Sequence, residues 1–196
     1  MDWFPLVILG ATAFAATNLD DAFVLLLFFG DRRYRARHVF IGQALGVGLL
    51  VLLSLVGALA AVALPARVVG LLGLLPIAIG VKQLFERRRD RQDESEAAAA
   101  PPRAAGWRQA AAVTGITLAN GGDNIGVYIP LFATRAPLET ALILGVFAAM
   151  LMVWAFTGYY LARHSAAARR LQQLSGATMP WVLIALGVAI LTEQWS

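Results

Sequence analysis

The chain has 196 residues, of which 59% are apolar and only 14% are charged, with a formal net charge of +4 and no cysteine. A soluble globular domain has about 25% charged residues, so this composition excludes one and indicates a polytopic membrane protein. The absence of cysteine also excludes disulfides, thiolate metal sites and catalytic thiols.

Stretches of low charge predict six membrane-spanning helices, because about 20 mainly apolar residues are needed to cross the hydrocarbon core. In chain order, the expected spans are 3–29, 39–66, 68–85, 109–132, 140–162 and 171–192. The first span contains Asp20 and Asp21, and the fourth contains Asp123. A signal peptide is not expected at the start, since Asp2 stands where a basic residue would be. We therefore expect an all-α integral membrane protein.

The basic residues predict the orientation of these spans. Fourteen of the sixteen Lys and Arg residues lie in or beside the connections that follow the first, third and fifth spans. The positive-inside rule places those connections in the cytoplasm and both termini outside, in a multi-pass protein of the bacterial inner membrane. The net positive charge then reflects membrane topology and not nucleic-acid binding. His38 and His164 stand at cytoplasmic helix ends, where we expect them at the membrane interface.

Residues 86–106 form a hydrophilic segment that we interpret as a cytoplasmic linker with a helical start. It divides one membrane domain into a first three-helix repeat, 1–85, and a second, 107–196. Shifting the chain by 103 residues lays Thr17-Asn18-Leu19-Asp20-Asp21 over Asn120-Gly121-Gly122-Asp123-Asn124 and Gly42 over Gly145; a shift of 107 lays 77–81 over 184–188. Since each half has an odd number of spans, the two repeats must be inverted. Inverted repeats are typical of secondary transporters, whose sites lie near the midplane.

Three carboxylates in the predicted spans are the most informative chemistry. Asp20 and Asp21 lie about two-thirds along the first span, and Asp123 has the matching place in the fourth. An ionised Asp at the centre of a spanning helix costs about 2.5–3.5 kcal/mol. No basic side chain is expected at that depth, so the carboxylates must be protonated, hydrated or facing a bound cation.

The neighbouring residues supply oxygen and favour a cation. Asn18 and Asn120 either ligate it or make helix-cap or interhelical hydrogen bonds, whereas Tyr128 is expected to have mainly a packing role. The glycine pair 121–122 lets the helix unwind, and Pro130 leaves a carbonyl without its helical partner. Oxygen ligands suit hard ions such as Mg²⁺, Ca²⁺ or Mn²⁺. The expected metal ligands are Asp20, Asp21, Asp123, Asn18, Asn120 and Asn124, with Thr17, Gly121, Gly122, Tyr128 and Pro130 in support.

The motifs at 17–21, 76–80 and 120–125, together with Tyr128 and Pro130, resemble those of the cadmium-resistance transporter family. That family belongs to the lysine-exporter superfamily of small six-helix exporters, and the resemblance covers nearly the whole chain. It implies efflux of a divalent cation by a secondary mechanism, with the Asn and Asp residues of these motifs at the site. The implied ion is Cd²⁺. Because the chain offers no thiol for Cd²⁺, a harder ion is the alternative.

The sequence thus predicts a transporter and not an enzyme, with the metal as substrate and no resident cofactor. No nucleotide-binding motif is present, so we expect ion gradients, and proton antiport in particular, to drive export. An exporter of amino acids or organic cations on the same scaffold, or a cation channel, stays an alternative. The Gly-x-Gly-Asp pattern of an intramembrane aspartyl protease is not matched before Asp123. Gly42 and Gly46 permit close helix packing within the chain or across a homodimer.

Overall fold

The computed structural model describes residues 3–90, 105–162 and 180–192, and the regular structure in these ranges is α-helical. The helices are α1 (Trp3–Gly30), α2 (Ala36–Val62), α3 (Ala66–Leu71), α4 (Leu74–Asp90), α5 (Arg108–Asn120), α6 (Gly122–Ala133), α7 (Pro137–Leu161) and a last helix, Pro180–Thr192.

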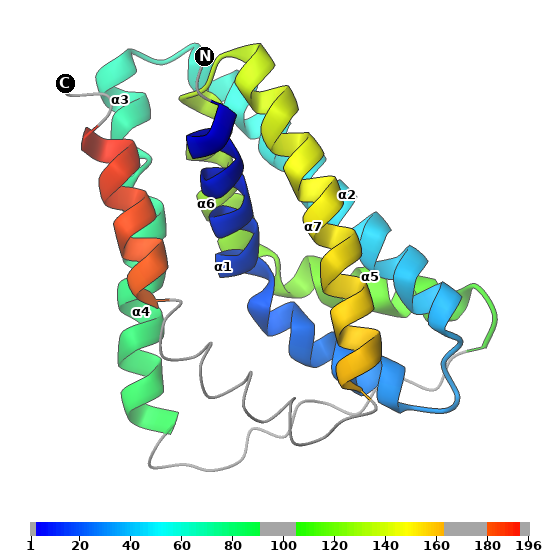
Figure 1. Ribbon diagram of the computed structural model, residues 1–196. Helices are drawn as coiled ribbons and strands as arrows, with labels where there is room; N and C mark the ends of the chain where they lie inside the picture. The colour runs from blue at the N-terminus through cyan, green and yellow to red at the C-terminus, as the bar shows by residue number, and fades with distance from the viewer. Residues whose placement is uncertain (1–2, 91–104, 163–179, 193–196) are drawn as a thin grey trace.

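The long helices reverse direction from one to the next (Figure 1). In that view α1 bends and runs downward, α2 runs up, α4 runs down beside the last helix, and α7 runs down again. Helix α5 crosses the middle of the view, and α6 then continues upward beside the first half of α1. The start of α1 and the end of the last helix therefore lie at the same end of the molecule.

The observed helices follow most of the expected spans, with two differences. The expected span 68–85 is divided by a turn at 72–73 into α3 and α4, and the expected span 109–132 is divided at Gly121 into α5 and α6. Helix α4 continues to Asp90, which agrees with a helical start of the linker. The rest of the linker and His164 lie outside the described residues, as does the first part of the expected span 171–192.

Two helices of the described chain are long and apolar enough to cross a membrane, Ala36–Ala61 and Pro137–Leu161. Two shorter apolar helices are Trp3–Leu19 and Pro180–Thr192. Helix α1 has the length of a span, but its apolar part stops where the polar motif begins. By helix length and apolar composition, the other expected spans stay predictions.

Helices from the two halves of the chain pack against each other. Helix α1 packs mainly on α7, and α2 packs on both α5 and α6. Helix α4 and the last helix approach so closely that a Cβ at Gly187 would lie 2.5 Å from the carbonyl oxygen of Gly73. Each half therefore depends on the other for the burial of its helices.

The Gly42 and Gly46 pair lies against α5 of the same chain. A Cβ at Gly42 would lie 2.6 Å from the carbonyl oxygen of Ala110, and one at Gly46 would lie 2.7 Å from Thr117. Only a residue without a side chain allows this approach of α2 and α5. The sequence left open whether these glycines serve the monomer or a dimer, and in this structure they serve the monomer.

The core lies where α1, α6 and α7 meet. Phe147 of α7 stands edge-on to Phe14 of α1, with ring centroids 5.5 Å apart, and 4.7 Å from the ring of Tyr128 in α6. All three rings are buried. This packing fixes the position of the Tyr128 ring, so its hydroxyl is directed at a defined point on α1.

Candidate metal-binding site

The hydroxyl of Tyr128 joins α6 to the polar motif of α1. It lies 2.8 Å from the hydroxyl oxygen of Thr17 and accepts a hydrogen bond from Nδ2 of Asn18 at 2.8 Å. The Thr17 hydroxyl also lies 3.1 Å from the carbonyl oxygen of Ala13, to which it donates. All of these side chains are buried. The expectation of a packing role for Tyr128 was incomplete, because its ring packs while its hydroxyl orders the site.

The side-chain amide of Asn124 lies between acceptor oxygens on both sides. One end is 3.3 Å from Oδ1 of Asn18, and the other end is 2.9 Å from the carbonyl oxygen of Thr17 and 3.1 Å from Oδ1 of Asp123. The better orientation points the nitrogen at Thr17 and Asp123, where it donates twice. The oxygen of Asn124 then faces the oxygen of Asn18. That oxygen also lies 3.4 Å from the hydroxyl of Tyr128, which can donate to it, so this orientation satisfies both ends of the amide.

Asp123 stands in the first turn of α6, immediately after the break between α5 and α6. Its Oδ1 accepts a hydrogen bond from the backbone N–H of Asn124 at 2.9 Å, and the side chain is half-buried. The first turn of a helix presents backbone N–H groups and a partial positive charge, which favour a carboxylate. The break therefore supplies part of the electrostatic support for Asp123.

The helix breaks where the glycine pair predicts it. Helix α5 ends at Asn120, Gly121 forms the turn, and α6 begins at Gly122. Gly121 has no room for a side chain, because a Cβ there would overlap the buried side chain of Leu50 on α2. Pro130 lies inside α6, and its side chain is buried.

A second group of polar side chains surrounds Asp21. Nε2 of Gln43 donates to Oδ2 of Asp21 at 3.2 Å, and the hydroxyl of Thr117 donates to Oε1 of Gln43 at 2.8 Å. These three residues come from α1, α2 and α5 and are buried. Asp21 lies about one helical turn after Thr17 and Asn18 on α1, on the same side of that helix. The two polar groups thus belong to one region.

Two of the expected ligands are not placed with the others. Asn120 is exposed at the end of α5, and the side chain of Asp20 lies outside what the structure describes. Among the described side chains, no three His, Cys, Asp or Glu residues gather closely enough to hold a metal ion together. A cation here would need amide and carbonyl oxygens as well as carboxylates.

Sequence reasoning missed two residues that touch the motif of α1. Gln43 was not singled out, although a polar side chain within a charge-free span is a signal that could have found it. The indole Nε1 of Trp154 donates to the carbonyl oxygen of Asn18 at 2.6 Å, which stabilises α1 within its polar motif. Nothing in the local sequence distinguishes Trp154 from a lipid-facing aromatic residue.

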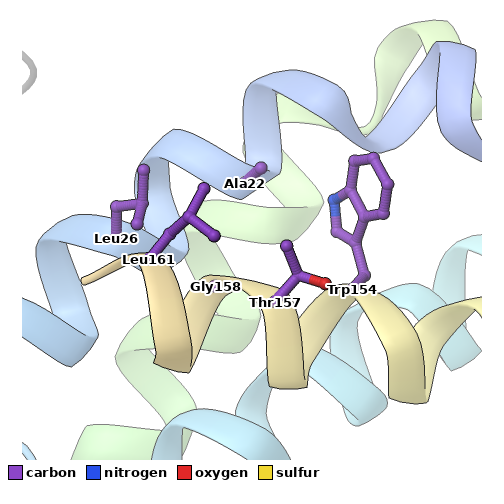
Figure 2. Close-up of a pocket in the computed structure, with 6 residues that line it drawn as sticks. All are labelled: Ala22, Leu26, Trp154, Thr157, Gly158 and Leu161. Atoms are coloured by element: carbon purple, nitrogen blue, oxygen red, sulfur yellow. The ribbon is translucent and has the colours of Figure 1, made fainter. Parts of the chain in front are cut away.

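A small cavity of about 60 Å³ lies beside Trp154, between α1 and α7. Figure 2 shows the side chains that line it: Ala22, Leu26, Trp154, Thr157, Gly158 and Leu161. Its walls are almost wholly apolar, so it offers a cation no ligands. The cavity is therefore separate in chemistry from the polar region around Tyr128.

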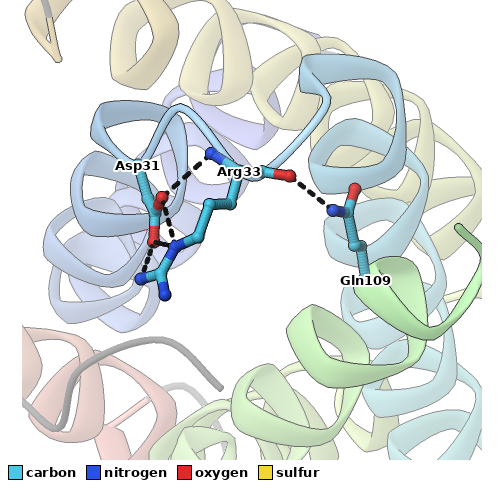
Figure 3. A network of polar contacts seen from close by, with 3 residues as sticks. All are labelled: Asp31, Arg33 and Gln109. Atoms are coloured by element: carbon cyan, nitrogen blue, oxygen red, sulfur yellow. Dashed lines mark hydrogen bonds and ion pairs between the residues drawn. The ribbon is translucent and has the colours of Figure 1, made fainter. Parts of the chain in front are cut away.

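The connection between α1 and α2 is tied to α5 by Gln109. The side chain of Gln109 donates to the carbonyl oxygen of Arg33 at 2.6 Å, and its oxygen lies 3.0 Å from Nδ1 of His38 (Figure 3 draws the first of these). His38 is buried within the protein, and its place at the membrane interface stays a prediction. It is buried because Gln109 and the ring of Trp107 cover it.

Figure 3 also shows the ion pair in this connection, in which the guanidinium of Arg33 holds the carboxylate of Asp31. The side chain of Arg33, and then its backbone N–H, hold the pKa of Asp31 below its ordinary value. The pair sits at the surface, which limits its value to stability. Its role here is to shape the turn that leads from α1 into α2.

Comparison with known proteins identifies one family. Residues 14–196 match the family model described as cadmium resistance transporter. The match includes both polar motifs and all of the helices after the first turns of α1. Comparison with curated proteins gives no significant match, and neither does comparison with solved structures.

Proposed function

The chain belongs to the cadmium resistance transporter family, and on that premise we propose that it exports a divalent cation across the bacterial inner membrane as a multi-pass secondary transporter. The substrate is Cd²⁺ or a harder ion such as Mn²⁺, Mg²⁺ or Ca²⁺. We also propose that proton entry drives export. We propose in addition that the chain belongs to the lysine-exporter superfamily.

The observation that carries the proposal is the gathering of oxygen atoms around the Asn124 amide: Oδ1 of Asn18, the carbonyl oxygen of Thr17 and Oδ1 of Asp123. Buried acceptor oxygens that face one another repel unless a hydrogen atom or a cation lies between them. A divalent ion placed between the amide oxygens of Asn18 and Asn124 would be ligated by both of them. Amide and carboxylate oxygens are ligands that hard divalent ions accept.

We assign the ligand roles within the expected set as follows. Asp123 and Asn124 supply oxygens from the first turn of α6, and Asn18 and Asp21 supply an amide oxygen and a carboxylate from α1. Asp20 precedes Asp21 and remains in the proposal on the sequence alone. Asn120 lies at the exposed end of α5, so its participation would require α5 to move.

The packing of the helices supports two inverted repeats. If α1, α2 and α4 correspond to α5–α6, α7 and the last helix, a two-fold axis would pair α1 with α7 and α2 with α5–α6. It would also pair α4 with the last helix. These pairings are present in the fold. The alternating helix directions also suit six spans in which the start of α1 and the end of the last helix lie on the same side.

Energetics favour antiport. Moving a divalent cation outward against an inside-negative potential of 100 mV costs about 4.6 kcal/mol before any concentration term. Two protons entering for each ion would cancel this electrical cost. The carboxylates of the site are the groups that would take up protons when the metal leaves.

Transport in proteoliposomes tests the function. The purified protein is reconstituted with a pH-sensitive dye inside, and each divalent ion is added in turn. We expect metal flux with opposite movement of protons in the natural chain, and loss of both in Asp123→Asn. Asp31→Asn, which removes a carboxylate from the exposed connection, is the matched control and should transport normally.

The outcomes separate the parts of the proposal. Metal flux without proton movement would overturn antiport and leave export in place. Unchanged flux in Asp123→Asn would contradict the site. Transport of lysine or an organic cation without metal flux would favour the alternative exporter, and a steady voltage-driven current without proton coupling would favour a channel.

A further inference from the structure

The side chain of Gln43 is held in one orientation by Thr117. The Thr117 hydroxyl donates to Oε1 of Gln43 at 2.8 Å, so Nε2 must point the other way, toward Oδ2 of Asp21 at 3.2 Å. Turning the amide over would place Oε1 against a carboxylate oxygen, and two acceptors do not bond. The hydrogen-bond chemistry therefore fixes which end of Gln43 faces Asp21.

The packing around this chain of hydrogen bonds prevents the amide from withdrawing. Gln43 is 1% exposed and Thr117 is fully buried. On either side of Gln43, the glycines 42 and 46 bring α2 into direct contact with α5, and the Thr117 hydroxyl donates across this contact. Gln43 thus links the motif of α1 to α5 about one turn before the break.

We propose that Gln43 is a positioning residue that determines the ion specificity of the site; this rests on the proposed function. The hydrogen bond from Nε2 occupies one lone pair of Oδ2 and holds that oxygen toward α2, so in this proposal Asp21 ligates the cation preferentially through Oδ1. Ca²⁺ takes six to eight oxygen ligands and accepts bidentate carboxylates, whereas Mg²⁺ requires a compact octahedron. Single-oxygen ligation by Asp21 favours the smaller ions.

Removal of the donor should relax this preference. In Gln43→Met the side chain keeps a similar length but loses the N–H, so both oxygens of Asp21 can reach one ion. Hydrogen bonds to charged groups are strong enough that we expect a change of about tenfold, toward Ca²⁺, in the ratio of the Ca²⁺ and Mg²⁺ dissociation constants.

Thermal unfolding of the purified protein over a titration of MgCl₂, MnCl₂ or CaCl₂ measures these constants. The natural chain is compared with Gln43→Met, Thr117→Val and Thr117→Ser. Thr117→Val leaves Gln43 in place but frees its amide to turn, so the ratio should shift in the same direction by less. Thr117→Ser keeps the hydroxyl, so its ratio of Ca²⁺ and Mg²⁺ dissociation constants should equal that of the natural chain.

The comparison of ratios separates this proposal from a general loss of stability. A merely structural role for Gln43 would weaken all ions together, and an unchanged ratio in Gln43→Met would overturn the proposal. If Gln43→Met does not fold, the Thr117→Val and Thr117→Ser pair decides in the same way. If no divalent ion stabilises the natural chain, the proposed function fails and this inference fails with it.

Discussion

The two polar motifs occupy matching places in the two halves of the chain, yet they differ in structure. Residues 17–21 lie within one bent helix, α1, whereas residues 120–124 contain the end of α5, a turn and the start of α6. Thr17, Asn18 and Asp21 are buried, but Asn120 is exposed and Asp123 only half-buried. The first motif is therefore the more enclosed of the two, and the second is partly open to its surroundings.

The glycine content of the two motifs explains why the helix continues through the first motif and breaks in the second. The second motif has two glycines where the first has Asn18 and Leu19, and each glycine disfavours a helix by about 1 kcal/mol relative to alanine. Each motif is also braced by a bulky side chain from the other half: Trp154 donates to the carbonyl of Asn18, and Leu50 fills the space beside Gly121. One brace is a hydrogen bond and the other is an apolar contact.

The largest expected effect is at the break. Gly121→Val would drive a branched side chain into Leu50, which is 1% exposed and has little space to move into. We expect the free energy of unfolding to fall by about 3 kcal/mol, as for overpacking in a well-packed core. Thermal unfolding in detergent measures it, with Gly115→Val as a control, because a Cβ at Gly115 meets no neighbouring atom. Equal losses in the two variants would contradict a specific role for the contact with Leu50.

The next effect concerns the link between the two motifs. Tyr128→Phe removes the hydroxyl that bonds to Thr17 and Asn18 and keeps the ring in its aromatic cluster. Interhelical hydrogen bonds in membranes are modest, so we expect a loss of about 1–2 kcal/mol. Thermal unfolding is again the measurement, and Tyr160→Phe on α7, at a side chain 62% exposed, should change little. Equal effects of the two variants would contradict the link.

A smaller effect is expected on α1 alone. Trp154→Phe removes the indole N–H that donates to Asn18 and leaves an aromatic ring in place. We expect a loss of about 1 kcal/mol in the free energy of unfolding, together with weaker stabilisation by metal, because Asn18 is less well held. Trp181→Phe on the last helix is the control, since that ring is 62% exposed. Unchanged metal stabilisation in Trp154→Phe would show that the brace does not serve the site.

The smallest effect lies beyond both motifs, in the connection after α1. Arg33 lowers the pKa of Asp31 in the folded chain. The stability that this carboxylate contributes is therefore fully present above the pKa of an ordinary Asp, about 3.9, and is lost as the pH falls through the pKa of the folded chain. Asp31→Asn should therefore be slightly less stable than the natural chain at neutral pH and equal to it in strong acid. Unfolding temperatures over a pH series check this, and a difference that grows toward acid pH would contradict it.

Much of the fold was predictable because membrane insertion is a local property of the chain. Low charge alone predicted the ends of α2 and α7 to within a few residues, and the glycine pair predicted the break at Gly121. The turn at 72–73 within the expected span 68–85 was not predicted; it lies where Gly73 meets Gly187 of the last helix. A contact between distant segments leaves no signal in the sequence around the turn.

The site was predictable in its residue types and only partly in its membership. Thr17, Asn18, Asn124 and Tyr128 do come together, because each stands in a polar motif that apolar sequence surrounds. Gln43 and Trp154 were missed, since their roles depend on which way α2 and α7 are rotated against α1. That rotation is set by packing between the halves, which no single motif encodes.

The bond between Trp154 and Asn18 also gives the protein a built-in optical probe. Of the tryptophans that the structure describes, Trp3, Trp107 and Trp181 are at least half exposed, whereas Trp154 alone touches the polar region. If the other four tryptophans of the chain are replaced by Phe, the emission of Trp154 reports on the hydrogen bond of its own indole. A shift in that emission on addition of a divalent ion would register occupation of the site without any label.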